Sequence, residues 1–188
     1  MKLGELVARL LVSAPRPDPR RVLGETWLTE QHLAARLAER AARLGRYPWL
    51  QAALADAAAE ARRGAERVAA ALAARGVTPP APTAPPPRSG SAWAQLRAAV
   101  EDLRVAAETY GAAAADLERD HGDVAALLRE LRTARLAAWH RLTWWLGYLE
   151  PAALEGADAA SPDALGAPEP PTAPVTGRLD IDGLPAAA

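Results

Sequence analysis

Apolar residues recur at alternating spacings of three and four along four long stretches of this chain, the spacing that places them on one face of an α-helix. The third stretch shows the pattern most clearly, along a seam of Trp93, Leu96, Val100, Leu103, Ala107, Tyr110, Ala114 and Leu117. The pattern predicts long helices over residues 19–44, 48–75, 91–120 and 123–149. A fifth, short amphipathic helix is predicted over 3–12, inside an N-terminal segment of residues 1–17.

Residues that begin and end helices stand at the bounds of these stretches. Asp18 precedes Pro19, which is the arrangement of a helix N-cap followed by proline at the first helical position. Gly45 and Gly76 follow the first and second helices, where glycine commonly ends a helix. Asp123 is expected to cap the fourth helix.

The segment between the second and third helices, residues 77–91, contains six prolines. Such a composition favours extended polyproline conformation, and at about 3.1 Å per residue the segment reaches about 45 Å. A helix over 48–75 is about 42 Å long, so the segment is able to return the chain along its full length. The alternative is a tether between two separate hairpins, but an alanine-rich hairpin has little to bury. We therefore predict an all-α fold, an antiparallel four-helix bundle over residues 18–154 with a long proline-rich crossover.

The overall composition excludes several classes of function. Of the 188 residues, 22 are basic and 23 acidic, so neither nucleic-acid nor membrane binding is predicted from charge. The chain has no cysteine, which excludes disulfides, thiolate metal sites and a thiol nucleophile. No apolar run approaches the roughly 20 residues of a membrane span, and a cytoplasmic protein is expected.

The predicted tail changes character at its end. Residues 155–176 consist mostly of small residues, proline and acids, and they are predicted to be a disordered linker. Residues 177–188 then bring Leu179, Ile181 and Leu184 close together. In an extended chain Leu179 and Ile181 project to the same side, and Gly183 permits a bend before Leu184. This is the layout of a short motif that docks into apolar pockets of a partner, although chance aliphatic residues in an inert tail are the alternative.

Two charged residues interrupt the apolar stripes of the predicted helices. Glu30 lies on the inner stripe of the first helix, and Arg135 continues the stripe of Leu128 and Leu131 in the fourth. A buried arginine needs an acidic partner, because an unpaired internal charge costs several kcal/mol. We therefore predict a buried charge cluster of Glu30 and Arg135, with Glu60 and Glu108 as further candidates. For the last two, ordinary charge on a solvated helix surface is the alternative.

Two hairpins joined by a long crossover resemble the ferritin-like four-helix-bundle superfamily. The segments Glu30-Gln31-His32-Leu33 and Glu60-Ala61-Arg62-Arg63 resemble its first and second helices. The resemblance implies a dinuclear iron site built from glutamates and two Glu-x-x-His motifs. Here Arg63 stands at the first histidine position, and Arg141 at the corresponding position of the last helix. Both motifs are broken, which argues against ferroxidase activity and implies a degenerate site, non-catalytic or weakly metal-binding, with no cofactor. The alternative is an iron-binding or iron-oxidising protein that uses Glu30, Glu60 and Glu108.

The segment Gly177-Arg178-Leu179-Asp180-Ile181-Asp182-Gly183-Leu184 resembles the targeting peptides of encapsulin cargo proteins. The matching positions are Gly177, Leu179, Ile181 and Leu184, while Asp182-Gly183 stands where that family often has Gly-Ser. The resemblance implies a cargo bound inside a bacterial protein nanocompartment, with the encapsulin-type shell protein as its partner. A homo-oligomer would strengthen such docking through avidity, and an aromatic patch of Trp139, Trp144, Trp145 and Tyr148 is either its interface or packing at a helix end. A helical adaptor whose tail binds a different partner is a further alternative.

Overall fold

Four helices make up the part of the chain that the structure, a computed structural model, describes: residues 17–44, 47–86 and 91–149. The helices are α2 (Pro19–Arg43), α3 (Pro48–Ala73), α4 (Ala92–Leu117) and α5 (Gly122–Tyr148). The predicted helical class is confirmed, and every helix bound falls within three residues of its predicted position. The predictions for residues 1–16, Gly45, 155–176 and 177–188 lie outside the described residues.

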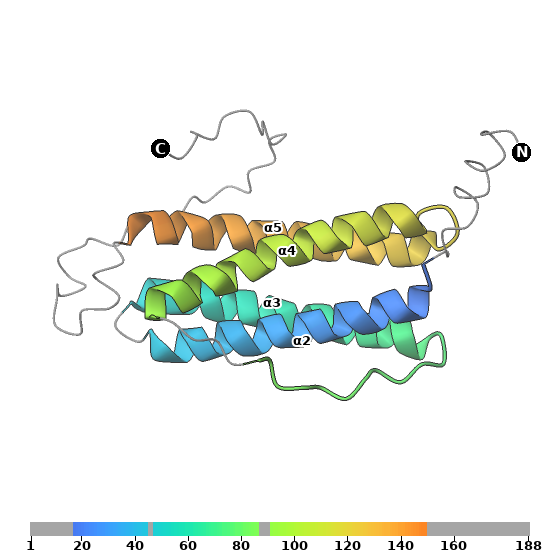
Figure 1. The fold of residues 1–188 in the computed structure, drawn as a ribbon, viewed down its shortest axis with the longest axis horizontal. Helices are drawn as coiled ribbons and strands as arrows, with labels where there is room; N and C mark the ends of the chain where they lie inside the picture. The colour runs from blue at the N-terminus through green and yellow to red at the C-terminus, as the bar shows by residue number, and fades with distance from the viewer. Residues whose placement is uncertain (1–16, 45–46, 87–90, 150–188) are drawn as a thin grey trace, which may run out of the picture.

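The helices pack side by side as two antiparallel hairpins (Figure 1). Helix α2 lies along α3, and α4 lies along α5, while smaller contacts join α2 to α4 and α3 to α5. The pairing fits a four-helix bundle in which each helix has two neighbours. All four helices therefore turn one face toward a shared interior.

Local sequence determines where the helices begin. The Asp18 side chain accepts a hydrogen bond from the Arg20 backbone N–H at 2.9 Å, as expected of an N-cap. Ser91 caps α4 in the same way through the backbone N–H of Ala94. The prediction that Asp123 caps α5 is wrong, because the helix already begins at Gly122. Asp123 lies in its first turn, where it forms an ion pair with Arg75 that joins α5 to the end of α3.

The chain leaves α3 through Gly76, whose φ of +68° is the left-handed conformation that glycine adopts without strain. Residues 77–86 then have no regular secondary structure and run back along the bundle (Figure 1). The Nε2 atom of His32 lies 3.1 Å from the carbonyl oxygen of Thr83 and 3.0 Å from its hydroxyl. This contact places the segment against α2.

The core is built from leucine and alanine. The α4 residues of the predicted seam are buried from Leu96 to Leu117, and Trp93 is partly buried. In α3 the buried positions are mostly small, including Ala57, Ala58, Ala61 and Ala65. Small side chains let helices approach closely, so the interior has little spare room at these positions.

Candidate functional site

Among the residues that the structure describes, three buried side chains are polar or charged: Thr26, Glu30 and Arg135. Glu30 and Arg135 are both 0% exposed, and Arg135 is the largest fully buried side chain. Charged residues are almost never fully buried unless they are paired. The interior of the bundle therefore contains a polar site that solvent does not reach.

Three helices meet at one carboxylate oxygen in this site. Glu30 lies on α2, and its Oε1 atom accepts a hydrogen bond of 2.7 Å from the Tyr110 hydroxyl on α4. The Nε atom of Arg135, on α5, lies 3.5 Å from the same oxygen. We call Glu30, Tyr110 and Arg135 the buried trio.

The fourth helix contributes space instead of a polar group. A Cβ atom on Gly64 of α3 would lie only 2.3 Å from Oε2 of Glu30 and 3.1 Å from a Leu131 methyl carbon. The glutamate carboxylate thus occupies the volume that a side chain at position 64 would fill. Glycine at this position is what admits a charged group between α2 and α3.

Much of the hydrogen-bonding capacity of the trio is not used within the described part of the chain. Oε2 of Glu30 and all three guanidinium nitrogens of Arg135 have no hydrogen-bond partner there. A buried polar atom without a partner costs about 1–3 kcal/mol. The attraction between the two opposite charges must offset this cost, so each charge depends on the other.

Burial also changes the proton affinity of the site. Removal from water raises the pKa of the Glu30 carboxyl above its usual value, while the Arg135 charge and the Tyr110 hydrogen bond oppose that shift. Burial raises the pKa of Tyr110 well above 10, and the negative charge of Glu30 adds to the effect. Tyr110 therefore keeps its hydroxyl proton and donates a hydrogen bond with it to the Glu30 carboxylate.

The raised pKa of Tyr110 leads to a spectroscopic prediction. In a titration followed by tyrosinate absorbance, Tyr110 should not ionise near its usual pKa in the folded chain and should do so once the chain is unfolded. The variant Tyr110→Phe should leave the titration curve of the folded chain unchanged. A loss of amplitude in the ordinary tyrosine range for this variant would contradict the buried hydrogen bond.

Neither of the two further candidates for the charge cluster is fully buried, which corrects the wider buried cluster considered from the sequence. Glu60 is half-buried, and its charge still raises the pKa of Glu30, whereas Glu108 is exposed. The Glu60 carboxylate is 35% exposed and accepts a hydrogen bond of 3.1 Å from Nε of Arg63 on its own helix. The Glu108 carboxylate is 62% exposed and pairs with Arg104, also on its own helix. In each case an arginine three or four residues away stabilises the solvated charge at the surface, so the carboxylate need not turn inward.

The described residues do not fit the dinuclear iron site that the ferritin-like resemblance implies. They contain no group of three or more acidic, histidine or cysteine side chains placed to hold a metal ion. The Glu60 charge is near enough to raise the pKa of Glu30, but the Glu108 carboxylate is 62% exposed, and the guanidinium of Arg135 lies beside Glu30 where a cation would be needed. His140 is exposed on α5, and its ring lies 4.6 Å from that of Trp139.

Sequence reasoning missed two members of the site. Tyr110 was assigned only to the apolar seam of α4, and Gly64 was not singled out. Both leave a signal: a tyrosine on an inner seam needs a partner for its hydroxyl, and a glycine in a helix interior often marks close packing. Neither signal identifies a contact partner until the residues on the facing helix are known.

The aromatic patch lies at the end of the bundle where α3 begins and α5 ends. Trp145 is 3% exposed and stacks on Trp49, with ring centroids 4.2 Å apart. Trp144 packs edge-on against Trp145 and is 39% exposed. Trp139 is partly buried against the core, and the side chain of Tyr148 lies outside the described residues. Trp139 and Trp145 are thus core packing, and Trp144 is the exposed member.

Comparison with models of protein families, with curated proteins and with solved structures finds no match to this chain. Within the described ranges, no helix has an apolar stretch long enough to cross a membrane.

Proposed function

We propose that the chain is an interaction protein, a cargo that docks to the inner wall of an encapsulin-type shell through residues 177–184. In this proposal the body is a degenerate ferritin-like bundle that binds no metal at its centre. The observation that carries the proposal is the separation of the two parts. Leu149 is the last buried residue of the core in the part of the chain that the structure describes, and the aliphatic motif follows after residues 150–176.

The chemistry of the motif suits docking to apolar pockets. Leu179 and Ile181 share one side of an extended chain, and Leu184 follows after Gly183. Full burial of each aliphatic side chain contributes about 1.5–3 kcal/mol before ordering costs are subtracted. One tail therefore binds weakly, and several tails on one assembly bind strongly through avidity.

The centre of the body supports a role without catalysis. Glu30 and Arg135 are 0% exposed and Tyr110 is 1% exposed, so the titratable groups of the trio lie away from solvent and substrate. The ion pair gives the centre an internal counter-charge, which a guanidinium supplies in place of a metal. The body then serves as a stable carrier of the tail, with the exposed Trp144 as the proposed contact between copies.

Co-expression with the encapsulin-type shell protein of the same genome tests the proposal. The full chain should elute with the shell in size-exclusion chromatography. The variant Leu179→Ala/Ile181→Ala/Leu184→Ala should lose at least about tenfold in the amount retained, because it removes most of the apolar area of the motif. Leu165→Ala, a matched loss of one aliphatic residue in the linker, should be retained like the parent chain.

Two results would reject the packaging proposal. One is equal retention of the triple variant and the parent chain. The other is a genome that encodes no such shell protein. Far-UV circular dichroism of each variant checks that the helical body is intact.

A further inference from the structure

A cleft of about 480 Å³ lies between α2, the start of α4 and the crossover. This volume is within the usual range for ligand pockets. Pro85 and Pro86 of the crossover form one wall, and Gln95 and Ala99 of α4 form another. The α2 wall contains Ala35, Glu39 and three arginines, namely Arg36, Arg40 and Arg43.

The charge of this arginine cleft is unbalanced. Residues 36, 40 and 43 follow the spacing of one helix face, so α2 directs three guanidinium groups to one side. Oε1 of Glu39 is shared between Arg40, at 3.4 Å, and Arg43, at 2.6 Å. The lining has three arginines and one glutamate, and Asp102 of α4 pairs with Arg36, so the cleft keeps an excess of one positive charge and attracts anions.

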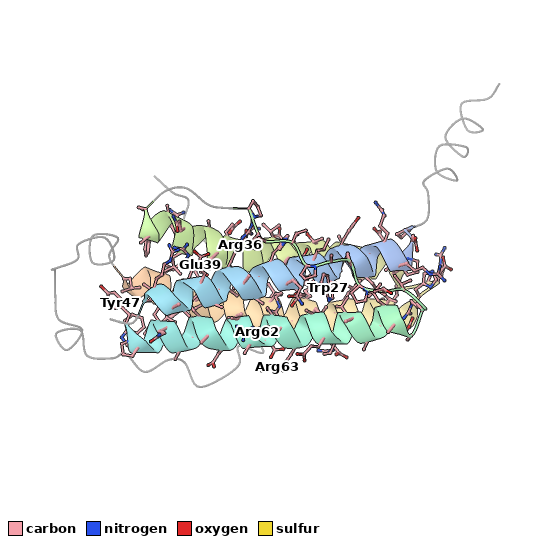
Figure 2. The ribbon with its side chains drawn as sticks, turned by 90° about the horizontal axis from the view of Figure 1, so that it is seen from below. Trp27, Arg36, Glu39, Tyr47, Arg62 and Arg63 are labelled. Carbon is pink, nitrogen blue, oxygen red and sulfur yellow. The ribbon has the colours of Figure 1, made fainter. Side chains whose placement is uncertain are left out.

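Arg36 connects the cleft to α4. Its guanidinium donates to Asp102 at 2.7 Å, while its Nε is buried without a hydrogen-bond partner in the described part of the chain. Figure 2 shows Arg36 and Glu39 on α2, whereas Arg62 and Arg63 come from α3. The two arginine groups thus lie on different helices, which makes the second a control for the first.

The net charge of the chain is close to zero, but positive and negative charges are distributed unevenly along the sequence. Residues 150–188 contain one basic residue, Arg178, and seven acidic residues, and therefore carry a net charge of −6. Residues 1–149 carry a net charge of +5. The C-terminal segment is thus an acidic peptide attached to a basic body, which is the complementarity that the arginine cleft requires.

The acidic segment starts at the same end of the bundle as the cleft. Helix α5 ends where α2 ends and α4 begins (Figure 1). The stacking of Trp145 on Trp49 also places the last turns of α5 at this end. Thirty residues between Glu150 and Asp180 span up to about 100 Å when extended, against about 40 Å for a helix of the bundle. The segment therefore reaches the cleft without strain, at an effective concentration on the order of millimolar.

We infer that the acidic segment around Asp180 and Asp182 docks into the arginine cleft of its own chain. Asp180 and Asp182 are two residues apart, so in an extended chain their carboxylates project to the same side. From there both carboxylates pair with the guanidinium groups of the cleft. Docking holds the segment against the body and competes with any external partner for it. Such docking involves one chain alone and takes place whether or not a shell is the partner.

The test uses the full chain, which has no cysteine, so that Ala186→Cys provides a single site for a nitroxide spin label. At low salt, the label should broaden the backbone amide signals of the cleft residues, such as Ala35 and Ala99, in a nitrogen-15 spectrum. At about 0.5 M salt the broadening should be lost, because exposed charges are screened.

Paired arginine variants identify the docking site. Arg40→Gln/Arg43→Gln should abolish the broadening at the cleft. Arg62→Gln/Arg63→Gln, which removes two exposed charges from α3, should leave it unchanged. The spectrum itself shows whether each variant is folded. Absence of broadening in the parent chain, or its equal loss in both variants, would overturn the inference.

Two further measurements distinguish the tail of the same chain from the other possible occupants of the cleft, which are the tail of a second copy and a free anion. Broadening in a mixture of isotope-labelled chains without nitroxide and unlabelled chains with nitroxide would assign the cleft to the tail of a second copy. Inorganic phosphate that shifts the cleft signals, in a chain whose own label broadens none of them, would assign it to a free anion. Either result would overturn docking within one chain. Packaging by a shell is measured separately, so the two proposals fail independently.

Discussion

Glu30→Leu should destabilise the bundle by about 3–5 kcal/mol at neutral pH, because it leaves a buried guanidinium without its counter-charge. Arg135 is 0% exposed, and an arginine cannot discharge by losing its proton at accessible pH. The opposite substitution, Arg135→Met, should cost less. The Glu30 carboxyl that remains can become neutral by binding a proton and still accept the Tyr110 hydrogen bond.

The cost of Arg135→Met should also depend on pH, in a direction that the Glu30 pKa determines. Burial already raises this pKa in the folded chain, and loss of the opposing Arg135 charge raises it further. A carboxyl whose folded pKa is raised favours folding fully below its unfolded pKa, near 4.5, and loses that contribution as pH rises toward the folded value. Arg135→Met should therefore be closest to the parent chain in mild acid and fall behind it toward neutral pH.

Urea unfolding followed by far-UV circular dichroism at about pH 5 and pH 7.5 measures both effects. The triple variant Glu30→Leu/Tyr110→Phe/Arg135→Met serves as the control, since it removes every charge and hydroxyl of the trio together. It should be as stable as the parent chain or more so, because burying an ion pair costs more than burying apolar groups of similar volume. A Glu30→Leu variant that loses less than about 1 kcal/mol would contradict the dependence of Arg135 on Glu30.

Gly64→Ala should destabilise the bundle by about 1–3 kcal/mol, the typical cost of overpacking a core. In an exposed helix interior the same substitution stabilises by about 1 kcal/mol, so the expected sign is reversed here. The added Cβ would meet Glu30 Oε2 at 2.3 Å and Glu30 Cδ at 3.0 Å, and the carboxylate is confined by the other members of the trio.

Gly24→Ala is the matched control, because a Cβ at this interior position of α2 has no atom within 4 Å. It should raise the free energy of unfolding by up to about 1 kcal/mol in the same urea titration. Glu30→Asp, which shortens the side chain, should recover part of the loss in Gly64→Ala. Equal stabilisation by Gly64→Ala and Gly24→Ala would show that the carboxylate does not need the space at position 64.

The helices could be predicted from the sequence because their signals are local. Asp18 and Gly76 act through the backbone groups next to them, and the seam of α4 is visible within a single helix. The exception is Asp123, where two cap-forming positions, His121 and Asp123, are only two residues apart. Asp123 pairs with Arg75, which follows α3 and is absent from the sequence around Asp123.

The site could be predicted only in part, because its membership depends on how helices face one another. Glu30 and Arg135 were identifiable, since a charge on an apolar stripe is anomalous within its own helix. Gly64 and Tyr110 are ordinary residues of their helices and gain meaning only from the carboxylate across the interior. Glu108 lies at the flank of its stripe, where a modest rotation of the helix decides between core and solvent.

The buried trio also determines which alignment of the two hairpins is permitted. Surfaces made mostly of leucine and alanine fit one another at several offsets, and sliding one hairpin by a helical turn, about 5.4 Å, changes such a contact little. The same slide would separate Arg135 from Glu30 and leave the guanidinium among leucines, at a cost of several kcal/mol. The ion pair thus fixes the axial register between the two hairpins. It costs some stability, but it leaves the repetitive leucine and alanine interior with a single favourable alignment.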